Sequence, residues 1–461
     1  MVTVDFQYGT LLVHGPEAEM APVRPWCRAD DRVQGWRAEG MAYGPIILAL
    51  HGAGVPYLDR ARAFQPLSLV LADAREPRDY QWAALEAWQG QGRRGVVVLP
   101  TGAGKSLVAQ RAMARTQRPT LVVVPTLDLV AQWARQLEEA FGVTVGILGG
   151  GERRVEAITV STYDSAVLTM EFHGNRFGLL VVDECHHLPS SSTQQLARLC
   201  IAPFRLGLSA TPERDDGSDR LLDDLLGPIC YRRDIDELRG RVLAPYRTVR
   251  LEVDLEADEQ ALYQRHRAVY TAFVRQNQIR LGDPRGWGRF IALCARQPEG
   301  RAALDAYLEQ RRLARGSRAK IRILWDLFRR HAGERLLVFT ADNATAYDIG
   351  RRFLLPVLTH HTRLAERRQT LDAFRSGEYP ILVTSRVLNE GVDVPEASVG
   401  IVVSGSASVR EHVQRLGRIL RPQAGKQAVL YELVSAGTSE SYVSERRRQH
   451  RAYQRTHTLP S

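Results

Sequence analysis

The chain has 461 residues, of which 44% are hydrophobic and 25% are charged, and this composition excludes large-scale disorder. Its formal net charge of +10 favours a polyanionic partner such as a nucleic acid, although an Arg-rich proteome would give basic proteins of every kind. Five cysteines, at positions 27, 185, 200, 230 and 294, have no CxxC spacing, which argues against a disulfide framework or a zinc module and is typical of a reducing compartment.

The beginning of the chain predicts a cytoplasmic protein that opens with a small domain. The first residues lack the basic stretch and long apolar run of a signal peptide. No segment approaches the ~20 apolar residues that span a bilayer, so we expect no membrane partner. Residues 1–70 are predicted to form a small α+β domain in which residues 10–13 are a strand and residues 45–50 are a strand or a helix.

A strand–helix repeat begins at about residue 76. Its apolar runs are rich in β-branched residues and do not alternate, as expected for strands that are buried on both faces of a parallel sheet. The segments between them, such as residues 106–115 and 127–141, have helical periodicity, so a doubly wound α/β domain is predicted. The predicted strands cover residues 96–99, 121–124, 158–160, 179–182 and 206–208.

The repeat stops at a charged helical block and then resumes. Residues 256–330 are helical in pattern, interrupted by a Gly-rich stretch at 282–288. A second strand–helix series follows and predicts another parallel-sheet domain. A polar, Arg-rich helix, usually a solvated face, is predicted for residues 444–455. The second series has strands at residues 336–339, 357–359, 381–383, 400–403 and 428–433.

Residues 100–106, PTGAGKS, follow a predicted strand and open a predicted helix, which is the context that a phosphate-binding loop requires. Glycines let backbone amides face phosphates, and the helix N-terminus adds positive potential. Lys105 can reach the terminal phosphates of ATP, and Ser106 can ligate Mg²⁺. A chance Gly-rich turn is the alternative. The residues expected to bind nucleotide here are Thr101, Gly102, Ala103, Gly104, Lys105 and Ser106.

Asp183 and Glu184 directly follow the apolar run at residues 179–182. A carboxylate at the tip of a buried strand can hold a metal ion, and a second carboxylate can orient and deprotonate water, the two roles that ATP hydrolysis needs. A zinc site at Cys185, His186 and His187 is the alternative, but adjacent residues cannot easily converge on one ion. Asp183 is therefore predicted to be a metal ligand and Glu184 a catalytic base.

Residues 414–421, QRLGRILR, lie in the second strand–helix series. Arginines at this spacing on a loop–helix junction suit stabilisation of the γ-phosphate from an opposing domain, and an arginine finger of this kind is worth ~10³–10⁵ in rate. The alternative is an exposed Arg-rich helix. Gln414, Arg418 and Arg421 are therefore predicted to be catalytic.

These segments occur in the order and spacing of superfamily 2 helicases, which the chain resembles. The strict phosphate-loop pattern has glycine at position 99, where this chain has leucine, and members of this superfamily commonly lack that glycine too. The resemblance implies two RecA-like lobes. It places Arg78 and Gln81 at the adenine base, and Gly391 and Asp393 in the motif that links DNA and nucleotide. The residues that it assigns to DNA-strand contacts are Pro125, Thr126, Ser161, Thr162, Thr340 and Thr384.

Within this superfamily the chain resembles the XPB family, especially its shorter archaeal and bacterial members. Residues 8–13, Trp26 and residues 31–32 are similar to that family's N-terminal damage-recognition domain, and residues 431–447 are similar to its C-terminal end. Residues 213–217 resemble the family's Arg-Glu-Asp element, although the middle side chain is one methylene shorter. Cys185 stands where members often have valine.

The family resemblance implies an ATP-dependent 3′→5′ DNA helicase or translocase that acts in DNA repair or duplex opening, on single strands and forks. A nuclease partner occurs in some prokaryotic members. The implied domains are a damage-recognition-like domain at residues 1–70, an ATP-binding lobe at 71–250, a linker and thumb-like helical segment at 251–330, and a second lobe at 331–461. The alternatives are a restriction-type translocase motor and an ATP-gated DNA-binding clamp that does not unwind.

The sequence leaves two interpretations open for the charged residues 214–216 and two for Trp287. Arg214, Asp215 and Asp216 are expected in an exposed loop that either meets the DNA fork and separates the strands or is a solvated turn. Trp287 is either a stacking residue for DNA or, the interpretation that we favour, a packing residue.

Overall fold

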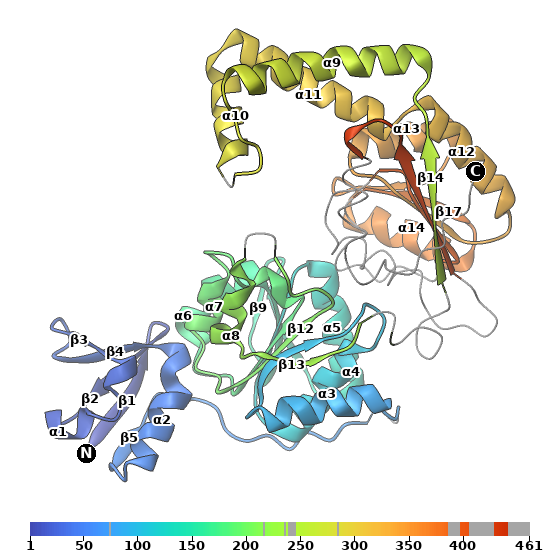
Figure 1. Cartoon of the computed structure of the whole chain (residues 1–461). Coiled ribbons are helices and arrows are strands. Elements are labelled where there is room, and N and C mark those ends of the chain that lie inside the picture. Colours follow the sequence, from blue (N-terminus) through green and yellow to red (C-terminus); the bar gives the residue numbers. More distant parts are fainter. Residues whose placement is uncertain are drawn as a thin grey trace. The chain divides into compact units, whose positions relative to one another are not determined.

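The computed structural model describes residues 1–72, 75–214, 217–234, 237, 246–283, 285–385, 397–404 and 428–440. They divide into two compact units, with residues 1–238 in the first and the rest of the described chain in the second. Among the described residues, the first unit contains a five-stranded and an eight-stranded sheet, and the second contains a six-stranded sheet (Figure 1). None of the described helices is long and apolar enough to cross a membrane.

The five-stranded sheet forms the N-terminal domain, in the order β3-β4-β2-β1-β5. Strands β1 (Val2–Gln7) and β2 (Thr10–His14) form a hairpin, whose turn residues Tyr8 and Gly9 have φ of 48° and 76°. A two-residue turn with these positive values matches the twist of paired strands. The predicted strand at residues 10–13 is confirmed. The remaining strands are β3 (Arg28–Asp30), β4 (Gly35–Glu39) and β5 (Tyr57–Asp59).

Helix α2 (Tyr43–Gly52) covers this sheet and decides the open prediction for residues 45–50 in favour of a helix. Its side chains Ile46 and Leu50 are fully buried against the alternate β1 residues Val2 and Val4. Short α1 (Glu17–Met20) adds the buried Met20 to the same core. The domain contacts the first lobe, where Arg198 pairs with Glu39 at 2.9 Å.

The eight-stranded sheet forms the first lobe, in the order β13-β6-β12-β11-β7-β10-β8-β9. All its neighbouring strands are parallel except β8 and β9. Each predicted strand of the first series lies in or overlaps one of these strands. They are β6 (Arg94–Val98), β7 (Thr120–Val124), β8 (Val145–Gly149), β9 (Glu152–Arg154), β10 (Ile158–Thr162), β11 (Leu179–Asp183), β12 (Phe204–Ser209) and β13 (Ile229–Arg232).

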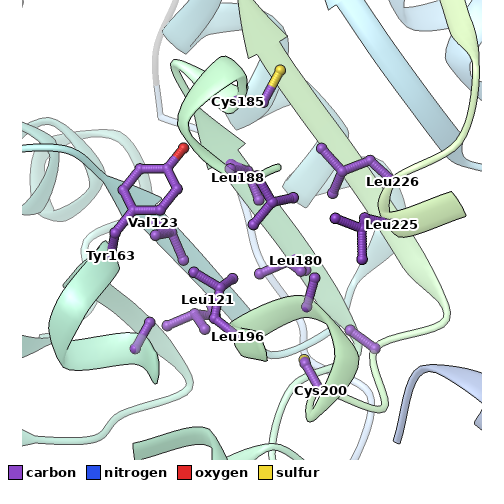
Figure 2. Packing of buried hydrophobic residues seen from close by; sticks show 14 of the residues in the cluster. Leu121, Val123, Tyr163, Leu180, Cys185, Leu188, Leu196, Cys200, Leu225 and Leu226 are labelled. Atoms are coloured by element: carbon purple, nitrogen blue, oxygen red, sulfur yellow. The ribbon is translucent and has the colours of Figure 1, made fainter. Parts of the chain in front are cut away.

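Helices α6 (Tyr163–His173), α7 (Gln194–Arg198) and α8 (Leu221–Leu225) cover one face of this sheet. Figure 2 shows Tyr163, Leu196 and Leu225 from these helices packing around Leu121 and Leu180 of the central strands. Strand residues alternate between faces, so their neighbours face α3 (Asp79–Gly90), α4 (Lys105–Thr116) and α5 (Leu127–Phe141). The central strands are therefore buried on both faces, which explains their unbroken apolar runs.

The six-stranded sheet forms the second lobe and is parallel, in the order β14-β19-β18-β15-β17-β16. The second predicted strand series lies in or overlaps its members. Helices α12 (Arg318–Arg330) and α13 (Asn343–Phe353) share its apolar core, and α14 (Leu364–Ser376) follows β16. Its strands are β14 (Tyr246–Val253), β15 (Leu336–Phe339), β16 (Val357–Leu358), β17 (Ile381–Thr384), β18 (Val399–Val402) and β19 (Ala428–Ser435).

Two elements lie outside the predicted limits of this lobe. Strand β14 pairs with β19 along its whole length, although residues up to 250 were expected in the first lobe. Helix α12 packs on the same sheet, although residues up to 330 were expected in the thumb-like segment. Sequence periodicity shows that a strand or helix exists but not which sheet it joins. The observed boundaries of the second lobe therefore differ from the predicted ones.

Three helices project from the second lobe. Helix α9 (Ala257–Gln276) and helix α11 (Pro298–Arg315) run side by side, and α10 (Gly286–Arg296) packs on α11 at the far end (Figure 1). Trp287 is 43% exposed, and its ring lies 5.2 Å from Phe290 and 5.1 Å from Tyr307. These contacts support packing as the role of Trp287. We call α9, α10 and α11 the helical projection.

Candidate nucleotide site

The residues 100–106 loop connects the end of β6 to the start of α4, as the sequence predicts. Gly102 and Gly104 have φ of 84° and 81°, values that side chains rarely adopt. They let the loop turn tightly so that α4 begins at Lys105 with its N-terminal amides facing the loop. Within the described chain, the buried hydroxyl oxygen of Thr101 has no hydrogen-bond partner. The loop thus has the conformation and free polar capacity of an anion cradle.

The segment that starts at Arg78 holds this loop in place. Tyr80 donates a hydrogen bond from its hydroxyl to the Ala103 carbonyl at 2.7 Å, and Gln81 Nε2 donates to the same carbonyl at 2.9 Å. A Cβ on Gly104 would lie 2.3 Å from Gln81 Nε2, so a side chain there would displace the Gln81 amide, and the positive φ of Gly104 favours glycine in any case. The sequence predicted Gln81 at the adenine base and missed Tyr80, while Arg78 is exposed.

Lys105, Asp183 and Glu184 come together at the ends of neighbouring structural elements. Lys105 Nζ lies 3.2 Å from Glu184 Oε1, and both side chains are largely buried. Asp183 ends β11 and is buried. Burial and the charge of Glu184 raise the pKa of the Asp183 carboxyl, while Lys105 and Trp133 act in the opposite direction. Glu184 has φ of 47°, so its backbone turns sharply out of the strand. The predicted cation and the two carboxylates are thus placed together.

Two aromatic residues outside the predicted nucleotide site hold Asp183 and Glu184 in place. Trp133 on α5 donates from Nε1 to Asp183 Oδ2 at 3.0 Å, inside the buried region. Tyr163 at the start of α6 donates its hydroxyl to the carbonyls of Asp183 at 2.8 Å and Glu184 at 3.1 Å. Neither residue stands in a sequence motif for nucleotide binding, and only the folded arrangement brings them to residues that are 20 or more positions away.

A series of polar contacts leads from Glu184 to the end of β12 and the residues that follow it. His186 Nδ1 lies 3.5 Å from Glu184 Oε2 and 3.2 Å from Ser209 Oγ, and Ser209 Oγ accepts from the Thr211 amide at 3.1 Å. Arg214 then donates to the His186 carbonyl at 2.8 Å. Arg214 is therefore half-buried in the loop after β12, in contact with the segment that follows Glu184. Asp215 and Asp216 lie outside the described residues.

The structure does not support a zinc site at residues 185–187. In the part of the chain that the structure describes, no three His, Cys, Asp or Glu side chains converge as metal ligands. Cys185 is instead fully buried in the apolar cluster of Figure 2, where burial raises the pKa of its thiol. His186 contacts Ser209, and His187 packs edge-on against Tyr163 at 5.8 Å.

The predicted strand-contacting residues of the first lobe lie at the starts of two helices. Thr126 accepts a hydrogen bond from the Leu129 amide and caps α5, and Thr162 accepts from the Ser165 amide and caps α6. Pro125 is half-buried beside the first cap, and Ser161 is fully buried beside the second. Helix N-termini offer free amides and positive potential to phosphates.

In the second lobe, Thr340 follows β15 and Thr384 is the last residue of the neighbouring parallel strand β17, and both are fully buried. The Thr340 hydroxyl donates to the Asp342 carbonyl at 2.9 Å, and the Thr384 hydroxyl donates to the Ser385 carbonyl at 3.0 Å. Their hydroxyls thus stabilise the ends of these strands. The predicted residues Gly391, Asp393, Gln414, Arg418 and Arg421 lie outside the described residues, as does the predicted helix at 444–455.

Comparison with known families matches three segments of the chain. The family described as "Xeroderma pigmentosum group B helicase damage recognition domain" matches residues 4–61. The family "Type III restriction enzyme, res subunit" matches residues 74–214, and the "ERCC3/RAD25/XPB C-terminal helicase" family matches residues 319–455.

Individual proteins match over most of the chain. "DNA 3'-5' translocase XPB2" of Sulfurisphaera tokodaii is 43% identical over 82% of this chain and 86% of its own length. "DNA 3'-5' helicase XPB" of Mycobacterium tuberculosis is 31% identical over 80% of this chain, which spans 63% of that protein.

A solved structure supports the fold. The Hef helicase domain of Pyrococcus furiosus has a TM-score of 0.55 and 18% identity, over 82% of this chain and 99% of that chain. This likeness confirms the predicted α/β fold with two RecA-like lobes. Taken with the three matching families and the 43% identity to the archaeal translocase, it leads to one assignment: the chain belongs to the XPB family of superfamily 2 helicases.

Proposed function

We propose that this protein is an ATP-dependent DNA translocase and helicase that moves 3′→5′. The observation that carries the proposal is the grouping of Lys105, Asp183 and Glu184 beside a glycine loop at the start of a helix. This grouping supplies a cation for phosphates, a ligand for a metal and a base for water. The direction of movement is that printed in the names of the similar archaeal and mycobacterial proteins.

The residues present suit ATP with Mg²⁺. The partnerless Thr101 hydroxyl and the turned glycines fit a phosphate, and an oxygen-only set of Ser106 and Asp183 fits Mg²⁺. When bound, Mg²⁺ would neutralise charge on the phosphates. Lys105 would exchange its contact with Glu184 for a phosphate oxygen, which leaves Glu184 to accept a proton from water. Arg418 and Arg421 are proposed to stabilise the charge on the γ-phosphate.

The DNA side of the mechanism rests on Thr126 and Thr162. The N-termini of α5 and α6 that they cap are proposed to hold DNA phosphates. Tyr163 begins α6 and hydrogen-bonds to the carbonyls of Asp183 and Glu184. A shift of α6 on DNA would therefore be transmitted directly to the two carboxylates. We infer that this contact couples DNA binding to ATP hydrolysis.

ATP hydrolysis assays with single-stranded DNA, duplex DNA and RNA test this proposal. We expect stimulation by DNA, loss of turnover with retained ATP binding in Glu184→Gln, and weaker ATP binding in Lys105→Ala, because the first change removes only the base and the second removes a phosphate contact. Near wild-type hydrolysis by Glu184→Gln would refute the assignment. A strand-displacement assay on the same DNA separates a helicase from an ATP-gated clamp, which would hydrolyse ATP without displacing the strand.

A further inference from the structure

A groove lies where the helical projection joins the second lobe, and none of the residues that line it has a role in the proposed function. It has a volume of about 280 Å³. Helices α9 and α11 form its walls, and the turn after β19 contributes Ser439 and Glu440. The residues of α9 and α11 that line it recur at intervals of three or four, so each helix presents one face. They include Arg267, Thr271, Tyr307, Arg311 and Arg315.

Three arginines line this groove, and the nearby carboxylates do not neutralise all of them. Arg315 lies 3.2 Å from Asp342, which compensates its charge. The other carboxylate, Glu440, lies 2.5 Å from the ammonium group of the fully buried Lys320 and is compensated there. Arg267 and Arg311 instead donate to the neutral hydroxyls of Tyr263 at 3.0 Å and Tyr307 at 2.6 Å. The groove therefore has surplus positive charge.

The geometry also keeps these cations in place. Arg311 lies over the Tyr307 ring, with its guanidinium carbon 5.2 Å from the ring centre. Burial, followed by the charge of Arg311, lowers the pKa of the Arg315 guanidinium, while Asp342 and Glu440 act in the opposite direction. Guanidinium groups match phosphate oxygens in shape and charge, and pre-ordered side chains lose little entropy when they bind.

We propose that the backbone phosphates of a nucleic-acid strand bind in this groove, held by Arg267 and Arg311. The inference rests on the proposed DNA translocation, because that function supplies the strand. The turn that contributes Ser439 and Glu440 also links the groove to the lobe. Tyr263 accepts a hydrogen bond from the Ser439 amide at 3.0 Å, and Lys320 bridges Glu440 to the Val403 carbonyl at 2.8 Å.

The test is the salt dependence of binding to a labelled single-stranded oligodeoxynucleotide, measured by anisotropy without nucleotide. The test variant is Arg267→Gln/Arg311→Gln in the full chain. Its control is Arg265→Gln/Arg312→Gln, which removes equal charge from exposed positions on the same two helices outside the groove. Each lost phosphate contact lowers the slope of log K against log salt by ~0.7, so the test variant should lose roughly 1.4 and the control almost nothing. Arg267→Lys/Arg311→Lys should keep the slope.

A second pair covers the case in which the glutamine variant does not fold. Thr271→Glu adds a negative charge at the exposed rim of the groove, while Ala268→Glu adds it at an exposed position on the same helix outside the groove. We expect weaker DNA binding only for Thr271→Glu. Equal behaviour of test and control variants, with normal DNA binding by the wild type, would overturn the groove alone. No DNA binding by the wild type would overturn the proposed function together with the groove.

Discussion

Replacing Trp133 by phenylalanine tests whether Asp183 is positioned to hold Mg²⁺. The change keeps an aromatic ring in the buried α5 face but removes the 3.0 Å hydrogen bond to Asp183 Oδ2. A hydrogen bond to a charged group contributes about 1.5–3 kcal/mol, or roughly 10- to 150-fold in an equilibrium constant. Loss of a metal ligand's supporting contact typically costs about 10- to 100-fold in metal affinity. We expect the Mg²⁺ concentration for half-maximal ATP hydrolysis to rise by about this factor.

The lost donor should also raise the pKa of Asp183 further, because Trp133 is one of the groups that lower it. The acidic limb of the pH–rate profile should therefore move to higher pH. Trp88→Phe is the matched control, since buried Trp88 donates its Nε1 to the Arg205 carbonyl at 2.8 Å, in the same lobe but outside the site. If Trp133→Phe and Trp88→Phe have the same Mg²⁺ dependence as the wild type, Trp133 does not position Asp183 for the metal.

Three further changes test other parts of the account. Tyr163→Phe removes two hydrogen bonds to backbone carbonyls, so kcat for DNA-stimulated ATP hydrolysis should fall roughly 2- to 10-fold with little change in KM for ATP; a rise in KM alone would contradict the coupling role. Arg214→Ala should lower ATP hydrolysis as well as fork unwinding, because Arg214 contacts the His186 carbonyl; loss of unwinding alone would restore the interpretation that it acts at the fork. Asp183→Asn should raise Tm at neutral pH. The folded-state pKa of Asp183 lies above its usual value, so the folded state binds the proton more tightly and wild-type stability falls as pH rises through that window. The gain should shrink as pH falls toward the usual carboxyl pKa, and a gain that grows on acidification would refute the assigned shift.

The fold could be predicted largely because its central strands appear in the sequence as unbroken apolar runs. Runs such as residues 121–124 and 179–182 are wholly buried between two helix layers, and burial on both faces leaves no polar position to obscure them. Membership in a sheet could not be predicted in the same way. Strand β14 carries a mixed pattern, and only its pairing with β19 places it in the second lobe.

The candidate site was predictable where consecutive residues carry the chemistry, as in the loop at residues 100–106 and the Asp183–Glu184 pair. Residues that act through tertiary contact gave no such signal. Tyr80, Trp133 and Tyr163 have the pattern of ordinary core aromatics, and their polar atoms find partners only in the folded chain. Arg205 shows the same limit, since it is fully buried and donates to four backbone carbonyls although its sequence context is an ordinary strand.

The central claim is directional movement along DNA driven by ATP hydrolysis at Lys105 and Glu184. Displacement of streptavidin from single-stranded oligonucleotides that carry biotin at one end measures this most directly. A motor that moves 3′→5′ should displace streptavidin from the 5′ end much faster than from the 3′ end, only with ATP, and not in the Glu184→Gln variant. Equal displacement from both ends, faster displacement from the 3′ end, or displacement by Glu184→Gln at the wild-type rate would contradict the account.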